Sequence, residues 1–350
     1  MKKLLVIAAV LSGVLVLQTS AGKDKKRHKA YNVNLPGFVG DYFDPMPIPE
    51  DNPVTAEGVA LGRKLFYDKR LSADHTISCG SCHKQEFAFA DNKQFSTGVN
   101  GQPGVRNSMS LVNLGWGKHF FWDGRAASLE EQVTDPITNK LEMANTWGLV
   151  LERLQQDPQY VRQFQKAFGP GKINSDLVMK ALGQFERTLV SFNTRFDQYY
   201  FEGNAKALTP QEERGLDIFF GIGQCNHCHS DVLLTDNFFR NNGLDLAPQP
   251  GLYNTTGKET DRGRMKVPSL RNVALTAPYM HDGRFKNLGE VLDFYSTSLQ
   301  QKSPNIDEHI VPLGRGLFLN DVQRADLIAF LHTLTDSSFI TNPAFSDPNP

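Results

Sequence analysis

Four cysteines and the histidines that follow them form the pattern with the clearest chemical meaning in this 350-residue sequence. They occur as Cys79-Gly80-Ser81-Cys82-His83 and as Cys225-Asn226-His227-Cys228-His229, two copies of C-x-x-C-H. Two thiols at this spacing can bond the two vinyl groups of one porphyrin, and the next residue can reach its iron. A redox dithiol or a zinc half-site requires no histidine directly after the second cysteine. The motifs therefore predict two covalently bound c-type haems, with His83 and His229 as proximal ligands.

Composition and the first residues indicate where the chain works. Lys and Arg number 37 against 38 for Asp and Glu, so no general electrostatic field attracts nucleic acid or anionic lipid. Lys2-Lys3 precede an apolar run from Leu4 to Leu17 and small residues up to Ala21, which is typical of a secretory signal peptide. A retained anchor is the alternative, but the run is shorter than the roughly 20 residues of a membrane span. We expect a signal peptide over residues 1–21, a periplasmic protein, no nucleic-acid partner and no stable membrane span after cleavage.

The elements that must position the two motifs repeat along the chain. In each half a helical segment precedes the motif, a D-G-R segment follows it, and an apolar helix comes late. Ser128 and Asn287 stand at matching helix starts, and a capping sequence begins another helix at Thr209. Such repetition indicates that one haem-binding unit was duplicated. The matching segments are 61–66, 121–125 and 182–190 in the first half, and 214–219, 280–284 and 327–334 in the second.

Strand signals are few, while apolar residues recur at spacings of three and four, which favours helices. We therefore predict an all-α fold of two tandem cytochrome c-like haem domains with long loops. The N-terminal domain is placed at 55–205 and the C-terminal domain at 206–340, followed by a tail at 341–350. Residues 22–54 are basic and then rich in proline, so we expect a solvated arm on the surface.

Several further segments carry a family resemblance. Phe121 to Ala126 reads FWDGRA, Glu131-Gln132 and Glu142-Met143 follow, and Leu270 to Gly283 reads LRNVALTAPYMHDG. With the paired C-x-x-C-H motifs, this set resembles the bacterial dihaem cytochrome c peroxidase family, which includes MauG, over roughly residues 55–340. The resemblance implies an enzyme that reduces hydrogen peroxide at the N-terminal haem, with electrons relayed through the C-terminal haem.

The resemblance also implies roles for individual residues. Glu142 would move a proton between the two peroxide oxygens, with Gln132 as its partner in the acid–base pair. Trp122 would carry electrons between the haems, because an indole can be oxidised transiently, although a plain core aromatic would be buried in the same way. One calcium ion would be held between the domains by oxygen ligands, which a hard cation prefers. The matching calcium positions are Asn107, Thr276 and Pro278.

The sequence departs from the peroxidase pattern at two places. Many relatives carry a histidine on the open side of the reactive haem, but Phe95 to Arg106 contains none, and the matching position falls near Val99. The relay haem of those peroxidases has a methionine ligand, whose position here is occupied by Tyr295, with Met280 and Met265 as rivals. A half-buried core tyrosine is the other interpretation of Tyr295. Both departures favour a MauG-like enzyme with an open N-terminal iron and a His/Tyr relay haem.

Two questions stay open at this stage. The electrons could come from a small periplasmic redox protein, which would make the chain a cytochrome c peroxidase, or from an aromatic residue of a partner protein. A different class of function is a non-enzymatic dihaem electron-transfer cytochrome with a strong ligand on both irons. In the first half its candidate ligands are His75 and His119, with Met109 and Met143 behind them.

Overall fold

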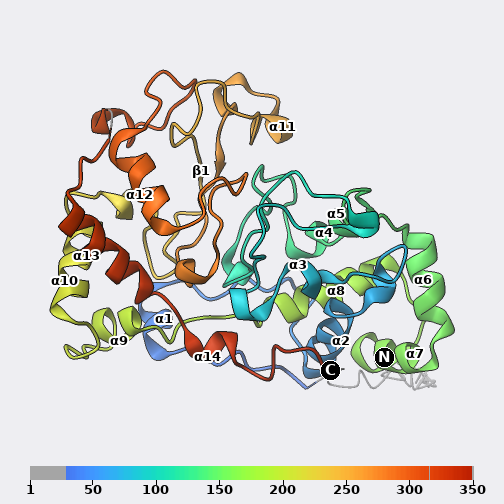
Figure 1. Ribbon diagram of the computed structural model, residues 1–350. Helices are drawn as coiled ribbons and strands as arrows, with labels where there is room; N and C mark the ends of the chain where they lie inside the picture. Colours follow the sequence, from blue (N-terminus) through green and yellow to red (C-terminus); the bar gives the residue numbers. More distant parts are fainter. Residues whose placement is uncertain (1–28, 315, 349–350) are drawn as a thin grey trace, which may run out of the picture.

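The computed structural model describes residues 29–314 and 316–348, and most of its regular structure is helical (Figure 1). The expected signal peptide at 1–21 and all of the basic part of the arm except Lys29 lie outside these residues. None of the described helices has the length and hydrophobicity needed to cross a membrane. The α-helices are α1 (Gly37–Tyr42), α2 (Ala56–Phe66), α3 (Cys79–Cys82), α4 (Leu129–Gln132), α5 (Thr134–Thr138), α6 (Trp147–Gln156), α7 (Pro158–Phe168), α8 (Ser175–Glu186), α9 (Arg195–Tyr200), α10 (Pro210–Phe220), α11 (Tyr253–Thr256), α12 (Leu288–Thr297), α13 (Asp321–His332) and α14 (Ser337–Ile340).

The prediction of a mainly helical protein is confirmed, with one small difference. Strand β1 (Phe239–Arg240) pairs antiparallel with β2 (Met265–Lys266). Strands of two residues are too short to show alternating hydrophobicity, so the sequence gives no sign of them. Single turns of 3-10 helix complete the regular structure, at Lys69–Leu71, Gln85–Phe87, Val99–Gly101, Leu114–Trp116, Cys225–His227, Glu259–Asp261, Val273–Leu275 and Val311–Leu313.

Two helix pairs with the same crossing geometry organise the molecule. Helix α2 packs on α8, and α10 packs on α13, in opposite parts of Figure 1. A Cβ atom on Gly62 would lie 1.9 Å from the carbonyl oxygen of Ala181, and one on Gly215 would lie 2.1 Å from that of Asp326. Only glycine allows the backbones to approach so closely. The same glycine-mediated crossing therefore occurs once in each half of the chain.

The loops after the C-x-x-C-H motifs also match between the halves. Phe120 forms an antiparallel bridge with Ala126, and Tyr279 forms one with Phe285. Ser128 and Asn287 then cap α4 and α12, as predicted, by accepting a backbone N–H bond three residues on. Backbone φ angles are positive at three matching pairs of positions, which are Asn113 and Asn272, Phe121 and Met280, and Gly124 and Gly283.

The buried apolar residues form separate clusters in the two halves. The first large cluster runs from Val54 to Leu189 and also includes Phe339 and Phe345 from the end of the chain, and the second runs from Phe196 to Leu334. The predicted helix start at Thr209 is confirmed, because Thr209 and Glu212 form a capping box at α10. The change from one cluster to the other lies between Leu189 and Phe196, and the boundary at residue 205 stays a prediction.

Both ends of the described chain pack on the rest of the molecule. Phe38 and Val39 of α1 are buried against Trp116, so the expectation of a solvated arm is wrong for this part. The last residues run from α14 back to the first half, where the Arg63 side chain donates to the carbonyl oxygen of Ser346 at 2.6 Å (Figure 1). Phe345 packs in the same cluster as Phe89. The C-terminal segment therefore stabilises the half that carries the first motif.

Candidate functional site

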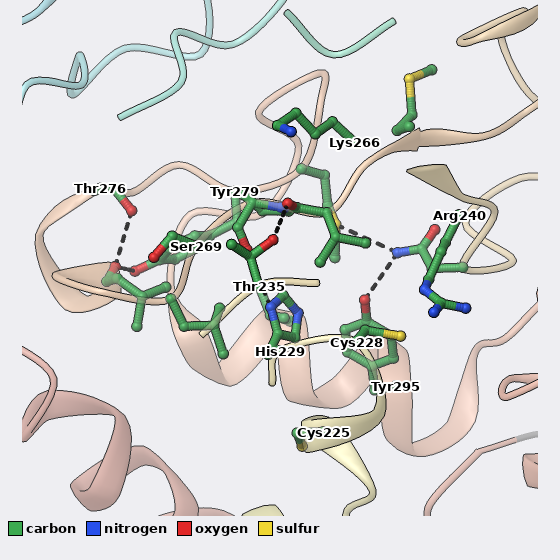
Figure 2. A pocket seen from close by; sticks show the side chains of 18 of the residues that line it. Cys225, Cys228, His229, Thr235, Arg240, Lys266, Ser269, Thr276, Tyr279 and Tyr295 are labelled. Atoms are coloured by element: carbon green, nitrogen blue, oxygen red, sulfur yellow. Dashed lines mark hydrogen bonds between the residues drawn. The ribbon is translucent and has the colours of Figure 1, made fainter. Parts of the chain in front are cut away.

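The second C-x-x-C-H motif lies against a largely apolar cavity of about 300 Å3. Cys225 begins a single 3-10 turn, Cys225–His227, which places both thiols and His229 along the cavity. Figure 2 shows Cys228, His229 and Tyr295 close together, with Cys225 below them. Two thiols, an imidazole and an apolar enclosure are the donor set that a covalently attached porphyrin requires, so these residues fit a c-type haem.

The histidine of each motif has the orientation and protonation that iron ligation needs. The Nδ1 atom of His83 lies 2.8 Å from the carbonyl oxygen of Phe89, and that of His229 lies 3.2 Å from the carbonyl oxygen of Pro268. A carbonyl can only accept, so Nδ1 carries the hydrogen and Nε2 keeps its lone pair for a metal. Burial also lowers the pKa of both imidazoles, which favours the neutral form.

Tyr295 reaches the same cavity from α12. Its hydroxyl oxygen accepts a hydrogen bond of 3.0 Å from the side-chain amide of Asn242, which also lies 3.8 Å from the sulfur of Met280. Burial raises the pKa of Tyr295 to about 12, and the bond from Asn242 opposes this rise. Met265 lines the cavity as well. Tyr295 and both of its sulfur rivals are therefore brought to one cavity, with Asn242 holding the tyrosine hydroxyl.

The first motif forms α3 and is held from several directions. Ser78 and Ser81 make a capping box at the helix start, and the Ser108 hydroxyl donates to the carbonyl oxygen of Cys82 at 3.1 Å. Burial raises the pKa of Cys79 and Cys82, and the nearby Glu142 carboxylate adds to the effect. Glu142 therefore lies on the side of the molecule where the first haem would attach.

Glu142 is a half-buried carboxyl group rather than a solvated one. Burial raises its pKa, while a hydrogen bond of 2.8 Å from the Asn139 amide to Oε1 opposes the rise. The backbone N–H of Val99, the position expected for a distal histidine, donates to the Glu142 carbonyl oxygen at 2.9 Å. Gln132 is half-buried at the end of α4, and no hydrogen bond joins its side chain to Glu142 in the described chain.

Trp122 is held by three contacts, two of which reach the other half of the chain. Its indole N–H donates to the carbonyl oxygen of Asn107 at 2.8 Å, and its own carbonyl oxygen accepts from the backbone N–H of Lys266 at 2.9 Å. Its ring meets that of His281 edge-on, with 6.4 Å between centroids. Trp122 also lines the cavity of the second motif. The indole is thus fixed at the boundary between the two motifs, where an electron relay would have to lie.

The three predicted calcium positions line the same cavity. Asn107 is buried, and its side-chain amide donates to the carbonyl oxygens of Lys93 and Gln94 at 3.2 Å each. Across residues 29–314 and 316–348, no cluster of three acidic, histidine or cysteine side chains is arranged to hold a metal ion. A cation beside Asn107, Thr276 and Pro278 would therefore depend on amide and carbonyl oxygens.

The extra ligands that a six-coordinate electron carrier would need are poorly placed. His75 and His119 are exposed, and the His119 ring packs against Phe239. Met143 is buried in the apolar cluster of the first half, whereas Met109 lines the cavity of the second motif. The two histidines that favoured this alternative therefore point to no cavity that the structure identifies.

Asn242, Lys266 and His281 are site residues that sequence reasoning did not single out. They come from loops and from β2, and no motif marks them, although His281 lies within a segment that repeats between the halves. Comparing the repeated segments residue by residue would have drawn attention to His281 alone. The other two are found only through the fold.

Comparisons with known proteins agree on one family. Residues 56–206 match the model described as di-haem cytochrome c peroxidase. The methylamine utilization protein MauG of Methylorubrum extorquens is 35% identical over 340 residues, which cover 95% of each chain. Cytochrome c551 peroxidase of Nitrosomonas europaea is 35% identical over 294 residues, or 83% of each chain.

One solved structure is similar to the present chain along almost the whole length of both. It is the crystal structure of a MauG-like protein associated with microbial copper homeostasis, with a TM-score of 0.83 and 38% identity. The similarity covers 91% of the present chain and 99% of that protein. The fold and the sequence motifs thus point to the same relatives.

Proposed function

Because this chain belongs to the dihaem cytochrome c peroxidase and MauG family, and is an oxidoreductase with two c-type haems, we propose that it is a MauG-like enzyme. Hydrogen peroxide is reduced in the N-terminal half, and the electrons come through the C-terminal half from an aromatic residue of a partner protein. When bound, the two haems supply the redox chemistry of peroxide reduction and electron transfer.

One observation carries the choice of the MauG-like branch, namely the position of the Tyr295 hydroxyl. It lies in the cavity of Cys225, Cys228 and His229, and the Asn242 amide holds it at 3.0 Å. Tyrosine ligation favours oxidised iron, whereas methionine ligation raises the potential and favours reduced iron. The Met280 sulfur, 3.8 Å from the same amide, is the competing ligand and would fit a cytochrome c peroxidase better.

Glu142 is the proposed proton carrier for peroxide reduction. Its pKa is raised by burial, so the carboxyl group holds a proton more readily than an exposed glutamate and can pass that proton on. Glu142 takes the proton from one peroxide oxygen and gives it to the other, which then leaves as water. Complete reduction consumes two electrons and two protons and yields two molecules of water. Gln132 would orient the peroxide, which is a smaller role.

Val99 and Trp122 have two further roles in the proposed reaction, in substrate access and in electron transfer. Val99 is 1% exposed and has no side-chain donor for a metal, so the side of the peroxide site beside Glu142 stays open to the substrate. Trp122 carries single electrons between the halves, and the Asn107 carbonyl fixes its indole N–H. We also propose a periplasmic location and a calcium ion at Asn107, Thr276 and Pro278.

The experiment that tests this function follows peroxide consumption by the oxidised holoenzyme. We expect wild-type protein to react at once, without prior reduction, and reduced small c-type cytochrome or cupredoxin to accelerate the consumption only slightly. A requirement for prior reduction would contradict the open site. Rapid oxidation of a small redox protein in step with peroxide would replace the partner-protein donor with the cytochrome c peroxidase activity.

A further inference from the structure

The ammonium group of Lys266 is buried beside the cavity of the second motif and forms no ion pair with a carboxylate of the described residues. Lys266 is 6% exposed and lines the cavity from β2. Its ammonium group donates to the amide oxygen of Asn237 at 3.1 Å, and no carboxylate of the described residues forms an ion pair with it. An ammonium group is costly to bury without a counter-charge. A molecule that fills this cavity and brings negative charge to Lys266 would offset this cost.

The other strong cation of the cavity is already neutralised. Arg240 donates to Asp236 at 2.7 Å and to Asp307 at 2.8 Å. The nitrogen that bonds to Asp307 also forms a hydrogen bond with the His309 ring. Arg240 lies near the thiol of Cys228, whose pKa it lowers against the dominant effect of burial. Near the attachment motif the positive charge of Arg240 is therefore neutralised by carboxylates. The positive charge of Lys266 has no carboxylate paired with it in the described chain.

The geometry of a c-type haem explains where the unbalanced charge is needed. The vinyl groups and the two propionate groups lie on opposite edges of the porphyrin, so thiols that hold one edge determine the direction of the other. In Figure 2, Cys225 and Lys266 lie at opposite ends of the view, with His229 between them. The carboxylates would therefore extend toward Lys266, on the side where the cavity meets Trp122.

Trp122 and His281 line the same cavity as Lys266. The Lys266 backbone N–H donates to the Trp122 carbonyl oxygen at 2.9 Å, and the Trp122 ring meets His281. His281 is 7% exposed, and its Nε2 atom is buried without a hydrogen-bond partner in the described chain. We infer that Lys266, together with His281, binds the propionate carboxylates of the C-terminal haem and directs that edge toward Trp122.

On this inference Lys266 positions the C-terminal haem and also changes its reduction potential electrostatically. Its positive charge disfavours ferric iron relative to ferrous iron, so it raises the reduction potential of the haem that it contacts. Tyrosine ligation by Tyr295 acts in the opposite direction. The inference rests on the proposed haem in the C-terminal half, but not on peroxide chemistry or on the identity of the electron donor.

The test is a spectroelectrochemical titration of full-length holoenzyme after the haem content has been measured. Wild type must first show two haems, since failure there would contradict the proposed function rather than the role of Lys266. Lys266→Met should lower the potential of the C-terminal haem and shift the propionate bending band in its resonance Raman spectrum. Lys266→Arg, which keeps the charge, should retain most of the wild-type potential.

Lys302→Met is the matched control, because Lys302 is exposed and loses the same charge. The downward shift for Lys266→Met should be at least three times the shift for Lys302→Met. Lys266→Gln, which keeps a donor for Asn237, replaces the methionine variant if that protein does not take up haem. Equal shifts for the buried and exposed variants, or an unchanged propionate band, would overturn the inference.

Discussion

The two halves of the molecule use one scaffold but differ at the position that Tyr295 occupies in the second half. Ser128 caps α4 and Asn287 caps α12, and counting the same distance from each cap leads to Pro136 in the first half and Tyr295 in the second. Tyr295 presents a hydroxyl group to the cavity, whereas a proline side chain has no donor for a metal. The duplicated scaffold therefore offers a candidate metal ligand at this position in one half and none in the other, which agrees with the absence of a histidine at Val99.

A second difference lies at the glycine-mediated helix crossings. Phe185 meets Gly62 and Phe330 meets Gly215, so the next residues, Glu186 and Leu331, are equivalent. Both are buried, but Glu186 carries a carboxyl oxygen without a hydrogen-bond partner in the described chain. The half assigned to peroxide therefore contains a buried acid where the other half has an ordinary core leucine.

The largest expected effect comes from removing one attachment motif at a time. Changing Cys79 and Cys82 to alanine should halve the haem content and abolish peroxide consumption, because the reactive site is lost. The equivalent change at Cys225 and Cys228 should also halve the haem content but leave peroxide able to react with the other half. A pyridine haemochrome assay and stopped-flow mixing measure both. If the second pair of changes alone abolished the initial reaction, the two roles would be assigned the wrong way round.

Glu142→Gln should have the next largest effect. Loss of the proton carrier should reduce peroxide turnover by about 10²- to 10⁴-fold, the usual range for general acid–base catalysis. Steady-state peroxide consumption measures this, and spectra of the resting protein should stay unchanged. Glu152→Gln is a suitable control, because that carboxyl group bonds only to Gln156 on the surface. A loss of less than about tenfold would remove Glu142 from the role of principal proton carrier.

Glu186→Gln should change how stability depends on pH. Burial raises the pKa of Glu186 to about 8, against 4.5 for the ordinary group. Between these values the folded protein keeps a proton that the unfolded chain has lost, so stability falls as pH rises, by roughly 1.4 kcal/mol per pH unit. Thermal unfolding between pH 5 and about 9 should show a flatter profile for the variant. Equal slopes for wild type and variant would mean that Glu186 is ionised in the folded protein.

Asn242→Leu should give the smallest effect. It removes the hydrogen bond to the Tyr295 hydroxyl, which contributes about 1 kcal/mol. The low-spin spectrum of the C-terminal haem should then become a mixture rather than disappear, because the tyrosine can still reach the cavity from α12. Electron paramagnetic resonance of the ferric protein measures this mixture. A spectrum identical to wild type would show that Asn242 does not position Tyr295.

The sequence predicts those features that depend on local chemistry. Helix caps at Ser128, Thr209 and Asn287 are confirmed, because capping is decided by a few neighbouring residues. The family and the mainly helical fold also follow from motifs and spacing. The roles of Glu142, Gln132, Trp122 and Tyr295 stay predictions, as do the haem and calcium ligands.

Features that depend on contacts between distant segments could not be predicted. Burial of Phe38 requires a surface built by Trp116 and Val232, which are far away in the chain. The Lys266 charge and the Asn242 amide matter only because β2 and a neighbouring loop bring them to the cavity of the second motif. Residue type and spacing carry no signal for such placements.

The most direct test of the difference between the halves is the electron paramagnetic resonance spectrum of the as-isolated ferric protein, before and after one equivalent of peroxide. The account predicts one high-spin signal from the open N-terminal iron and one low-spin signal of the His/Tyr type, with peroxide altering the high-spin signal. The low-spin signal should change type in Tyr295→Phe protein. Two low-spin signals that do not respond to peroxide would contradict the account and leave an electron-transfer cytochrome.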